Sequence, residues 1–182
     1  NKKKEQNEKF QVYAFKKANA YKKEVIDIKI KGKEIINCSM LSTSNDKVQL
    51  VGFYSSVREN GKANKELKGI YNATIDSNTN VNENLKFNEF DYATKVKLLG
   101  ERKAKKGKDL KPYYKIHTII EKNDGGLIVL SEERYVYVGR TQGIGPLGFT
   151  PITYYTNEII VTCLKPDGSL EWSNVVAKDQ NA

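Results

Sequence analysis

Short segments in which apolar and polar residues alternate, divided by turn signals, constrain this chain more than any other feature. In "EVIDIKI" (24–30), three isoleucines alternate with Val25, Asp27 and Lys29, the pattern of a strand with one face buried. Similar segments rich in β-branched and aromatic residues recur along the chain. Strands are predicted at 10–15, 24–30, 34–41, 47–54, 69–75, 81–87, 113–120, 127–138, 157–164 and 169–176. The pattern predicts an all-β fold.

The strand pattern occurs twice in the same order. Asn45-Asp46 and Asn123-Asp124 mark matching turns at an offset of 78, "INCSML" aligns with "KIHTII", and "LVGFY" aligns with "IVLSE". Farther along, "KGIYNATIDSNTNV" follows the pattern of "NEIIVTCLKPDGSL". A repeated antiparallel unit of four strands is typical of propeller blades. An ordinary sandwich with similar hairpins is the alternative.

The pattern divides the chain into five parts. We expect a disordered or extended basic tail at 1–9, the last two strands of an incomplete unit at 10–32, a complete four-strand unit at 33–90, a basic helical insert at 91–111 and a second complete unit at 112–180. So few units cannot close a propeller ring, so further chain or a partner is expected to cover the outermost sheets. The first residue is Asn1 instead of Met, which suggests a processed or trimmed piece of a longer protein. The charged start "NKKKEQNEKF" has no apolar stretch behind it, so it does not have the pattern of a signal peptide.

One segment between the two units lacks the strand pattern. "FDYATKVKLLGERKAKKGKDLKP" (90–112) is rich in helix formers, which predicts a short helix over 92–106. Val96 and Leu99 fall on one face of that helix, and Gly107 is placed to end it.

The same segment holds most of the excess charge. From Lys95 to Lys111 there are eight Lys or Arg residues against Glu101 and Asp109, so it carries +6 of the net +9. Such a surface attracts polyanions, and the nearby tyrosines of "KPYYK" are of the kind that stack on bases. A solvated helix kept soluble by its lysines is the simpler interpretation.

Metal or thiol chemistry finds little support in the sequence. Cys38 and Cys163 each lie in an apolar, strand-like run, so both are expected to be buried free thiols with unactivated sulfur. The one histidine, His117, is expected to share a strand face with Lys115 and Ile119, without a second ligand at metal spacing. No catalytic residue, metal site or cofactor site is predicted.

The charged run Glu132-Glu133-Arg134 is the strongest candidate for catalysis, since two carboxylates suffice for glycoside hydrolysis. Adjacent strand residues point to opposite faces, however, so these two glutamates cannot flank one bond. The Gly-rich "GRTQGIGPLG" (139–148) lacks the Gly-Lys-Ser/Thr ending of a phosphate loop and joins two predicted strands. A hairpin loop is expected there, of the kind that carries binding surfaces.

The runs "EKNDGGLIVLSEERYV", "YYTNEIIVTCLKPDGSLEWSNVVAKDQ" and "GFYSS…KGIYNATID" resemble an exported bacterial β-propeller-like repeat protein of unassigned function. The resemblance covers about residues 10 to 180 and rests on structural motifs of the repeat. It implies two and a half blades, an extracytoplasmic location (periplasm, outer-membrane surface or secreted) and a longer parent protein. It assigns no functional residues.

Three functions follow as hypotheses. The first is a non-catalytic binding or scaffolding module that uses the loops 55–68 and 139–151; the second is part of a carbohydrate-active enzyme, and the third is a structural subunit of a cell-envelope assembly. The expected partner is another protein chain or the rest of the parent protein, with an acidic glycan as a further ligand and nucleic acid disfavoured. The candidate binding surface comprises Arg102, Lys103, Lys105, Lys106, Arg140, Tyr154 and Tyr155.

Overall fold

The computed structural model describes residues 9–57, 64–143 and 148–182. The helices are η1 (Lys17–Asn19), a 3₁₀ turn, and the α-helices α1 (Tyr92–Leu99) and α2 (Glu101–Lys105). The strands are β1 (Phe10–Phe15), β2 (Lys23–Ile28), β3 (Lys33–Ile35), β4 (Ser39–Ser42), β5 (Lys47–Ser56), β6 (Gly69–Asp76), β7 (Val81–Glu89), β8 (Tyr114–Glu121), β9 (Leu127–Val138), β10 (Ile152–Leu164), β11 (Leu170–Val176) and β12 (Gln180–Asn181). All named strand pairs are antiparallel, which confirms the all-β class. The predicted helical insert 91–111 contains α1 and α2.

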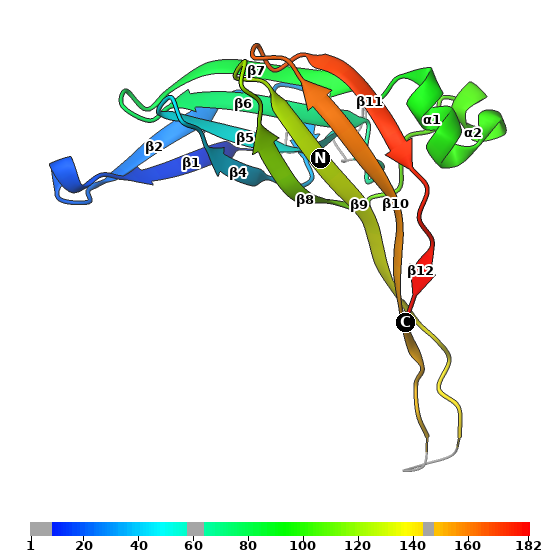
Figure 1. Ribbon diagram of the computed structural model, residues 1–182. Helices are drawn as coiled ribbons and strands as arrows, with labels where there is room; N and C mark the ends of the chain where they lie inside the picture. The colour runs from blue at the N-terminus through cyan, green and yellow to red at the C-terminus, as the bar shows by residue number, and fades with distance from the viewer. Residues whose placement is uncertain (1–8, 58–63, 144–147) are drawn as a thin grey trace, which may run out of the picture.

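The strands form three layers (Figure 1). The β1–β2 hairpin is the first layer. The first sheet has the order β3-β5-β6-β7, with β4 also paired to β5, and the second sheet has the order β11-β10-β9-β8, with β12 paired to β10. The first sheet lies in the middle, because one apolar core joins it to the hairpin and another joins it to the second sheet.

The edge strand of the first sheet differs from the expectation. The predicted strand 34–41 is interrupted between β3 and β4, where Asn37 turns its side chain back to the sheet: its Oδ1 accepts from the Phe53 amide at 2.8 Å, and the Tyr71 hydroxyl donates to its carbonyl at 3.0 Å. Gly52, beside it, leaves room for the Asn37 carbonyl. A local polar contact therefore replaces part of the strand ladder.

The first hairpins of the two sheets have the same register and the same irregularity. In each hairpin, two flanking residue pairs lie four residues apart on the edge strand but only three residues apart on its partner. The extra residue of the edge strand forms a one-residue bulge. The flanking pairs are Ile35↔Tyr54 and Ser39↔Val51 in the first sheet and Tyr114↔Glu133 and Thr118↔Leu130 in the second. Every residue of these pairs is related by an offset of 79 (114 − 35, and likewise 133 − 54).

The offset of 78 taken from the Asn-Asp turns is therefore off by one residue. The residue with positive φ is Asp46 in the first turn and Gly125 in the second, again 79 apart. A slip of one residue exchanges the two faces of a strand, so "LVGFY" (50–54) corresponds to 129–133 instead of 128–132. "INCSML" over "KIHTII" keeps its alignment.

The last hairpins also share a bulge. Near the turn of each hairpin, between two successive pairs, the third strand steps back by one residue while the fourth strand advances by two. The pairs are Ile75↔Asn82 and Thr74↔Asn84 in the first sheet and Leu164↔Leu170 and Cys163↔Trp172 in the second. The two sheets thus correspond from their first strand to their last.

The sheets stack with corresponding faces pointing the same way. The first sheet places Val51, Phe53 and Ile70 against the second sheet, which contributes Leu127 and Val129 to the same core. At the offset of 79, Val51 corresponds to Leu130, which lies on the opposite side of the second sheet from Val129. The first sheet packs one of its faces on the hairpin. The corresponding face of the second sheet packs on the first sheet.

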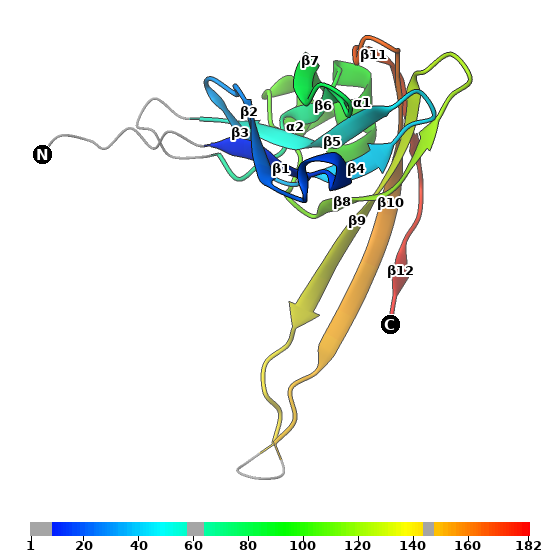
Figure 2. The ribbon, with the colours of Figure 1, turned by 90° about the vertical axis from the view of Figure 1, so that its left-hand side faces the viewer.

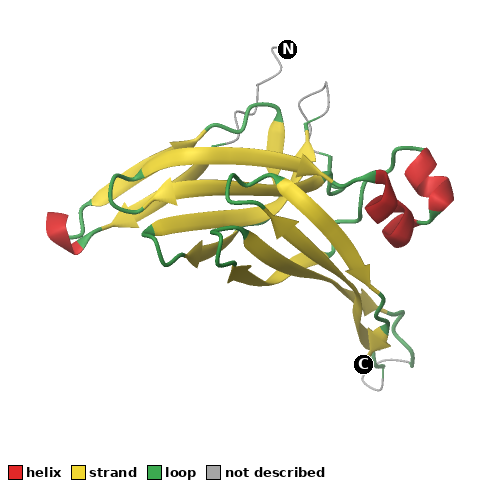
Figure 3. Ribbon diagram, turned by 45° about the horizontal axis from the view of Figure 1, so that its top comes forward, coloured by secondary structure: helices red, strands yellow, loops and turns green. Residues whose placement is uncertain are grey.

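The helical insert packs beside the sheets (Figure 3). Asp91 caps α1 by accepting from the Thr94 amide at 2.7 Å, and the Thr94 hydroxyl is 2.6 Å from that of Ser173 on β11. The expected helix over 92–106 is present but is divided at Gly100, whose φ of 80° favours glycine. Gly107, with a φ of 64°, follows its end.

An arm projects from the second sheet (Figure 2). It consists of the last part of β9, from Arg134 to Val138, and the first part of β10, from Ile152 to Thr156. β10 was expected to begin at 157, but in the structure it begins at Ile152, directly after the predicted loop 139–151. Residues 144–147 of that loop, 58–63 of the loop 55–68 and 1–8 of the expected tail lie outside the described residues.

Candidate functional site

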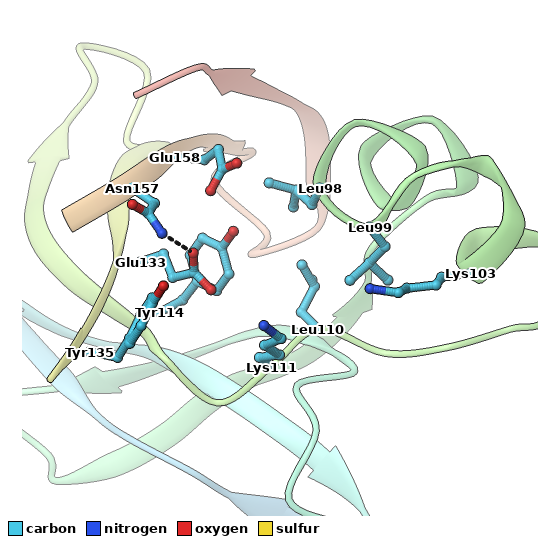
Figure 4. A pocket seen from close by; sticks show the side chains of 10 residues that line it. All are labelled: Leu98, Leu99, Lys103, Leu110, Lys111, Tyr114, Glu133, Tyr135, Asn157 and Glu158. Carbon is cyan, nitrogen blue, oxygen red and sulfur yellow. Dashed lines mark hydrogen bonds between the residues drawn. The ribbon is translucent and has the colours of Figure 1, made fainter. Parts of the chain in front are cut away.

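A polar pocket of about 210 Å³ lies between the helical insert and the base of the arm (Figure 4). Its walls come from the two helices, the segment that follows them, and strands β8, β9 and β10. The lining residues are Leu98, Leu99, Lys103, Leu110, Lys111, Tyr114, Glu133, Tyr135, Asn157 and Glu158. The pocket therefore joins elements that the sequence assigned to separate parts.

A bulge in β10 gives the pocket two of its polar groups. The register of β9 and β10 shifts between Thr156 and Ile159, so that two residues, Asn157 and Glu158, oppose the single residue Glu133. Adjacent residues in a regular strand point to opposite faces, whereas a bulge lets both line one pocket.

Glu133 is the buried carboxylate of the pocket. The Asn157 Nδ2 donates to its Oε2 at 2.9 Å, while the Asn157 Oδ1 is buried without a hydrogen-bond partner among the described residues. Burial, with added contributions from Glu133 and Glu158, raises the pKa of the Tyr114 hydroxyl far above its ordinary value, so Tyr114 remains a neutral donor. The pocket thus offers carboxylates, an amide oxygen and a phenol to a hydroxyl-bearing or amine ligand, with Lys103 and Lys111 at its rim.

Glu132 points the other way, as the alternation predicts. Its carboxylate accepts from Lys178 and Arg134 on the face of the second sheet that is directed away from the pocket. Lys178 contributes most to lowering the pKa of Glu132, and Arg134 adds to it, against the opposing effect of burial. The charged run is consequently divided between an ion-pair cluster and the pocket.

The predicted surroundings of His117 are right for Lys115 and wrong for Ile119. His117 is the bulged residue of β8, so Ile119 shares the inner face with Tyr114 and Ile116, and Lys115 lies on the outer face. The exposed His117 ring places Nδ1 3.4 Å from the Arg134 Nη2. Within the described residues, no group of three or more His, Cys, Asp or Glu side chains is arranged to hold a metal ion.

The two cysteines behave differently from each other. Cys163 is buried as expected, and burial together with a hydrogen bond to Glu171 at 3.1 Å raises the pKa of its thiol. Cys38 is exposed, against the expectation, because it lies in the interruption between β3 and β4. Both thiols are free.

The residues of the predicted binding surface lie in two groups. The first comprises Arg102, Lys103 and Lys105 on α2, followed by Lys106, all exposed. The second comprises Tyr154 and Tyr155 on the arm and Arg140, which follows the end of β9.

The pocket lies between these two groups without joining them into one surface. Lys103 lines it directly, and Tyr155 reaches it through Tyr135, since the two rings stack with centroids 4.8 Å apart. Asn157 and Glu158 were missed from the sequence, because nothing in "YYTNEII" marks the bulge that turns both toward Glu133.

No protein-family model, curated protein or solved structure matches the chain. Among the described residues, no helix combines the length and the apolar character needed to cross a membrane.

Proposed function

We propose that the chain is a non-catalytic binding or scaffolding module made of β-propeller-like units, and that it belongs to an exported bacterial protein. The units are the two sheets, with the β1–β2 hairpin as the remaining part of a third. In this proposal the module acts by adding a partner to the end of its stack of β-layers. The resemblance in sequence supports the export and the propeller-like character.

The observation that carries the proposal is the open outer face of the second sheet. Along each strand, the residues of this outer face alternate with the residues that pack on the first sheet. Its apolar side chains are Ile120, Ile128, Leu130, Ile159, Val161, Cys163, Trp172 and Val176. Ile120, Trp172 and Val176 are each about half exposed.

The corresponding face of the first sheet is closed. Val51, the counterpart of Leu130, is fully buried, because the second sheet covers it. The two faces are built alike, but one is covered and the other open. A contiguous apolar patch of this kind on a β-sheet is typical of a protein-binding surface.

The chain supplies its own probe for the test, since Trp172 is its one tryptophan. Immobilised wild-type chain should retain protein from a solubilised bacterial envelope fraction, and the emission of Trp172 should shift to shorter wavelength as the bound protein excludes water. Ile120→Lys should reduce retention about tenfold or more, because it places a charge on the apolar outer face where the partner packs.

Val81→Lys is the matched control, because Val81 is equally exposed but lies on β7 of the first sheet. Equal retention by wild type and Ile120→Lys, or unchanged Trp172 emission on binding, would remove the support for the proposal.

The pocket favours a second candidate, a part of a carbohydrate-active site, because it brings Glu133 and Glu158 to one cavity. Glu133 accepts a hydrogen bond from Asn157, however, and catalysis by Glu133 would require that this bond break. Hydrolysis of a polysaccharide by the wild-type chain, abolished in Glu133→Gln and retained in Glu132→Gln, would establish this alternative. The third hypothesis, a structural subunit of an envelope assembly, uses the same outer face as the binding module.

A further inference from the structure

The β1–β2 hairpin covers only part of the first sheet. It has two strands, whereas each of the other sheets has a path of four hydrogen-bonded strands and a fifth strand off that path. The uncovered part is evident from corresponding positions at the offset of 79. Met40 is 68% exposed, whereas its counterpart Ile119 packs against the core; Val48 is half-buried, whereas its counterpart Leu127 is 2% exposed.

A groove of about 250 Å³ marks this gap. It runs beside β1 and over the exposed part of the first sheet, and its apolar lining includes Val12, Ala14, Phe15, Met40, Val48 and Ile75. β2 is the one strand that pairs with β1 among the described residues, so the other edge of β1 adjoins the groove. An unpaired strand edge beside an apolar groove is the arrangement used to add a strand to a sheet.

The arm has the complementary surface. Val136 pairs with Tyr154 and Val138 with Ile152, which places four apolar side chains on one face of a two-stranded hairpin. All four are more than half exposed. Two-stranded hairpins have little stability alone in water, so the arm gains from packing on another apolar surface.

The arm and the groove of one chain lie on different layers. The arm leaves the second sheet and points away from the body (Figures 1 and 2). The groove is lined by β1 and by residues of the first sheet on the side that the hairpin covers, away from the second sheet. The occupant that fits the groove is therefore an arm from another molecule. Its two strands equal the number by which the hairpin falls short of a four-stranded unit.

We propose that the groove beside β1 receives the β9–β10 arm of a second copy of this chain. β9 of the arm then lies along the free edge of β1, and Val136 and Val138 cover Met40 and Val48. The contact joins different surfaces of the two copies, so repetition gives an open chain or a ring of copies. It uses neither Ile120 nor Trp172 and stands independently of the outer-face proposal.

Sedimentation velocity of the whole chain at rising concentration tests the contact. Wild type should assemble beyond a dimer. Met40→Glu removes the groove and Val138→Glu removes the arm, and both residues are exposed, so the fold should remain intact. Each variant alone should associate at least about tenfold more weakly than wild type. Val81→Glu, a change on another exposed strand residue, should assemble like wild type.

Mixing the two variants gives the decisive result. Each dimer can form one intact contact, between the arm of Met40→Glu and the groove of Val138→Glu, so the mixture should stop at a one-to-one dimer. A wild-type chain that stays monomeric up to about millimolar concentration, where even weak contacts are populated, would overturn the proposal. Assembly of either variant alone at wild-type strength, or a mixture that remains monomeric, would overturn it as well.

Discussion

At the scale of single residues, positions 52 and 131 illustrate how two corresponding units differ. Gly52 lies beneath the Asn37 carbonyl, which occupies the space of a Cβ atom. Ser131, its counterpart at the offset of 79, has a Cβ atom and a buried hydroxyl with no hydrogen-bond partner among the described residues. In the first sheet, Gly52 makes room for the Asn37 turn that interrupts the edge strand, whereas in the second sheet the edge strand β8 is continuous.

Gly52→Ala should destabilise the fold by about 1–3 kcal/mol, since the added methyl group forces the Asn37 carbonyl away from its bond to Tyr71. Ser131→Ala is the matched variant and should be neutral or slightly stabilising, because it removes a buried polar group that has no partner. Urea unfolding measures both. Equal losses of stability in the two variants would contradict the proposed difference between the sheets.

Glu132 gives the second residue prediction. Its pKa is lowered by Lys178 and Arg134, so its ionised form binds protons less readily in the folded state than in the unfolded state. The resulting stabilisation is fully present above the ordinary glutamate pKa of about 4.5 and is lost as the pH falls through the lower, folded-state pKa.

The stability advantage of wild type over Glu132→Gln should therefore be constant from pH 8 to pH 6 and should shrink below about pH 4.5. Urea unfolding of both proteins across this range measures it. Glu101→Gln, on the exposed face of α2, serves as the control. An advantage that grows toward low pH would show that the ion pairs to Lys178 and Arg134 are not its source.

At the scale of elements, the sequence predicted nearly every strand and the helical insert, because alternation and turn residues are local signals. It did not predict the bulges at His117 and at Asn157-Glu158, or the break between β3 and β4. Each of these is decided by a neighbouring strand, and each changes which side chains share a face. The pocket could not be predicted for the same reason, since it depends on one of those bulges.

The basic insert carries a prediction of its own. Arg102, Lys105 and Lys106 are exposed beside the pocket, so the double variant Arg102→Glu, Lys106→Glu should bind an acidic glycan at least about tenfold more weakly than wild type at low salt. The affinity of the wild-type chain for the glycan should also fall steeply as the salt concentration rises. Lys17→Glu with Lys22→Glu, the same charge change at two exposed lysines between β1 and β2, should bind like wild type. A uniform loss in both double variants would assign the binding to net charge alone.

At the scale of the whole molecule, the β1–β2 hairpin and the two sheets stack in three layers, and the two sheets point their corresponding faces in one direction. The pairing of β3 and β4 with β5 and that of β8 with β9 share one offset, and the bulges of the first and last hairpins recur. The bulge at Asn157-Glu158 has no counterpart in the pairing of β5 with β6. The orientation leaves the outer face of the second sheet open and the far face of the first sheet partly open beside β1. Both proposed contacts follow from where this stack ends.

The most direct test of this account is the pattern of methyl contacts between the two sheets in solution, measured by nuclear Overhauser effects on methyl-labelled chain. The stacking predicts contacts from Leu127 and Val129 to Val51 and Ile70, and none from Leu130 to either. Contacts from Leu130 to the first sheet, with Val129 facing solvent, would mean that the second sheet presents its opposite face and that the stacking is wrong.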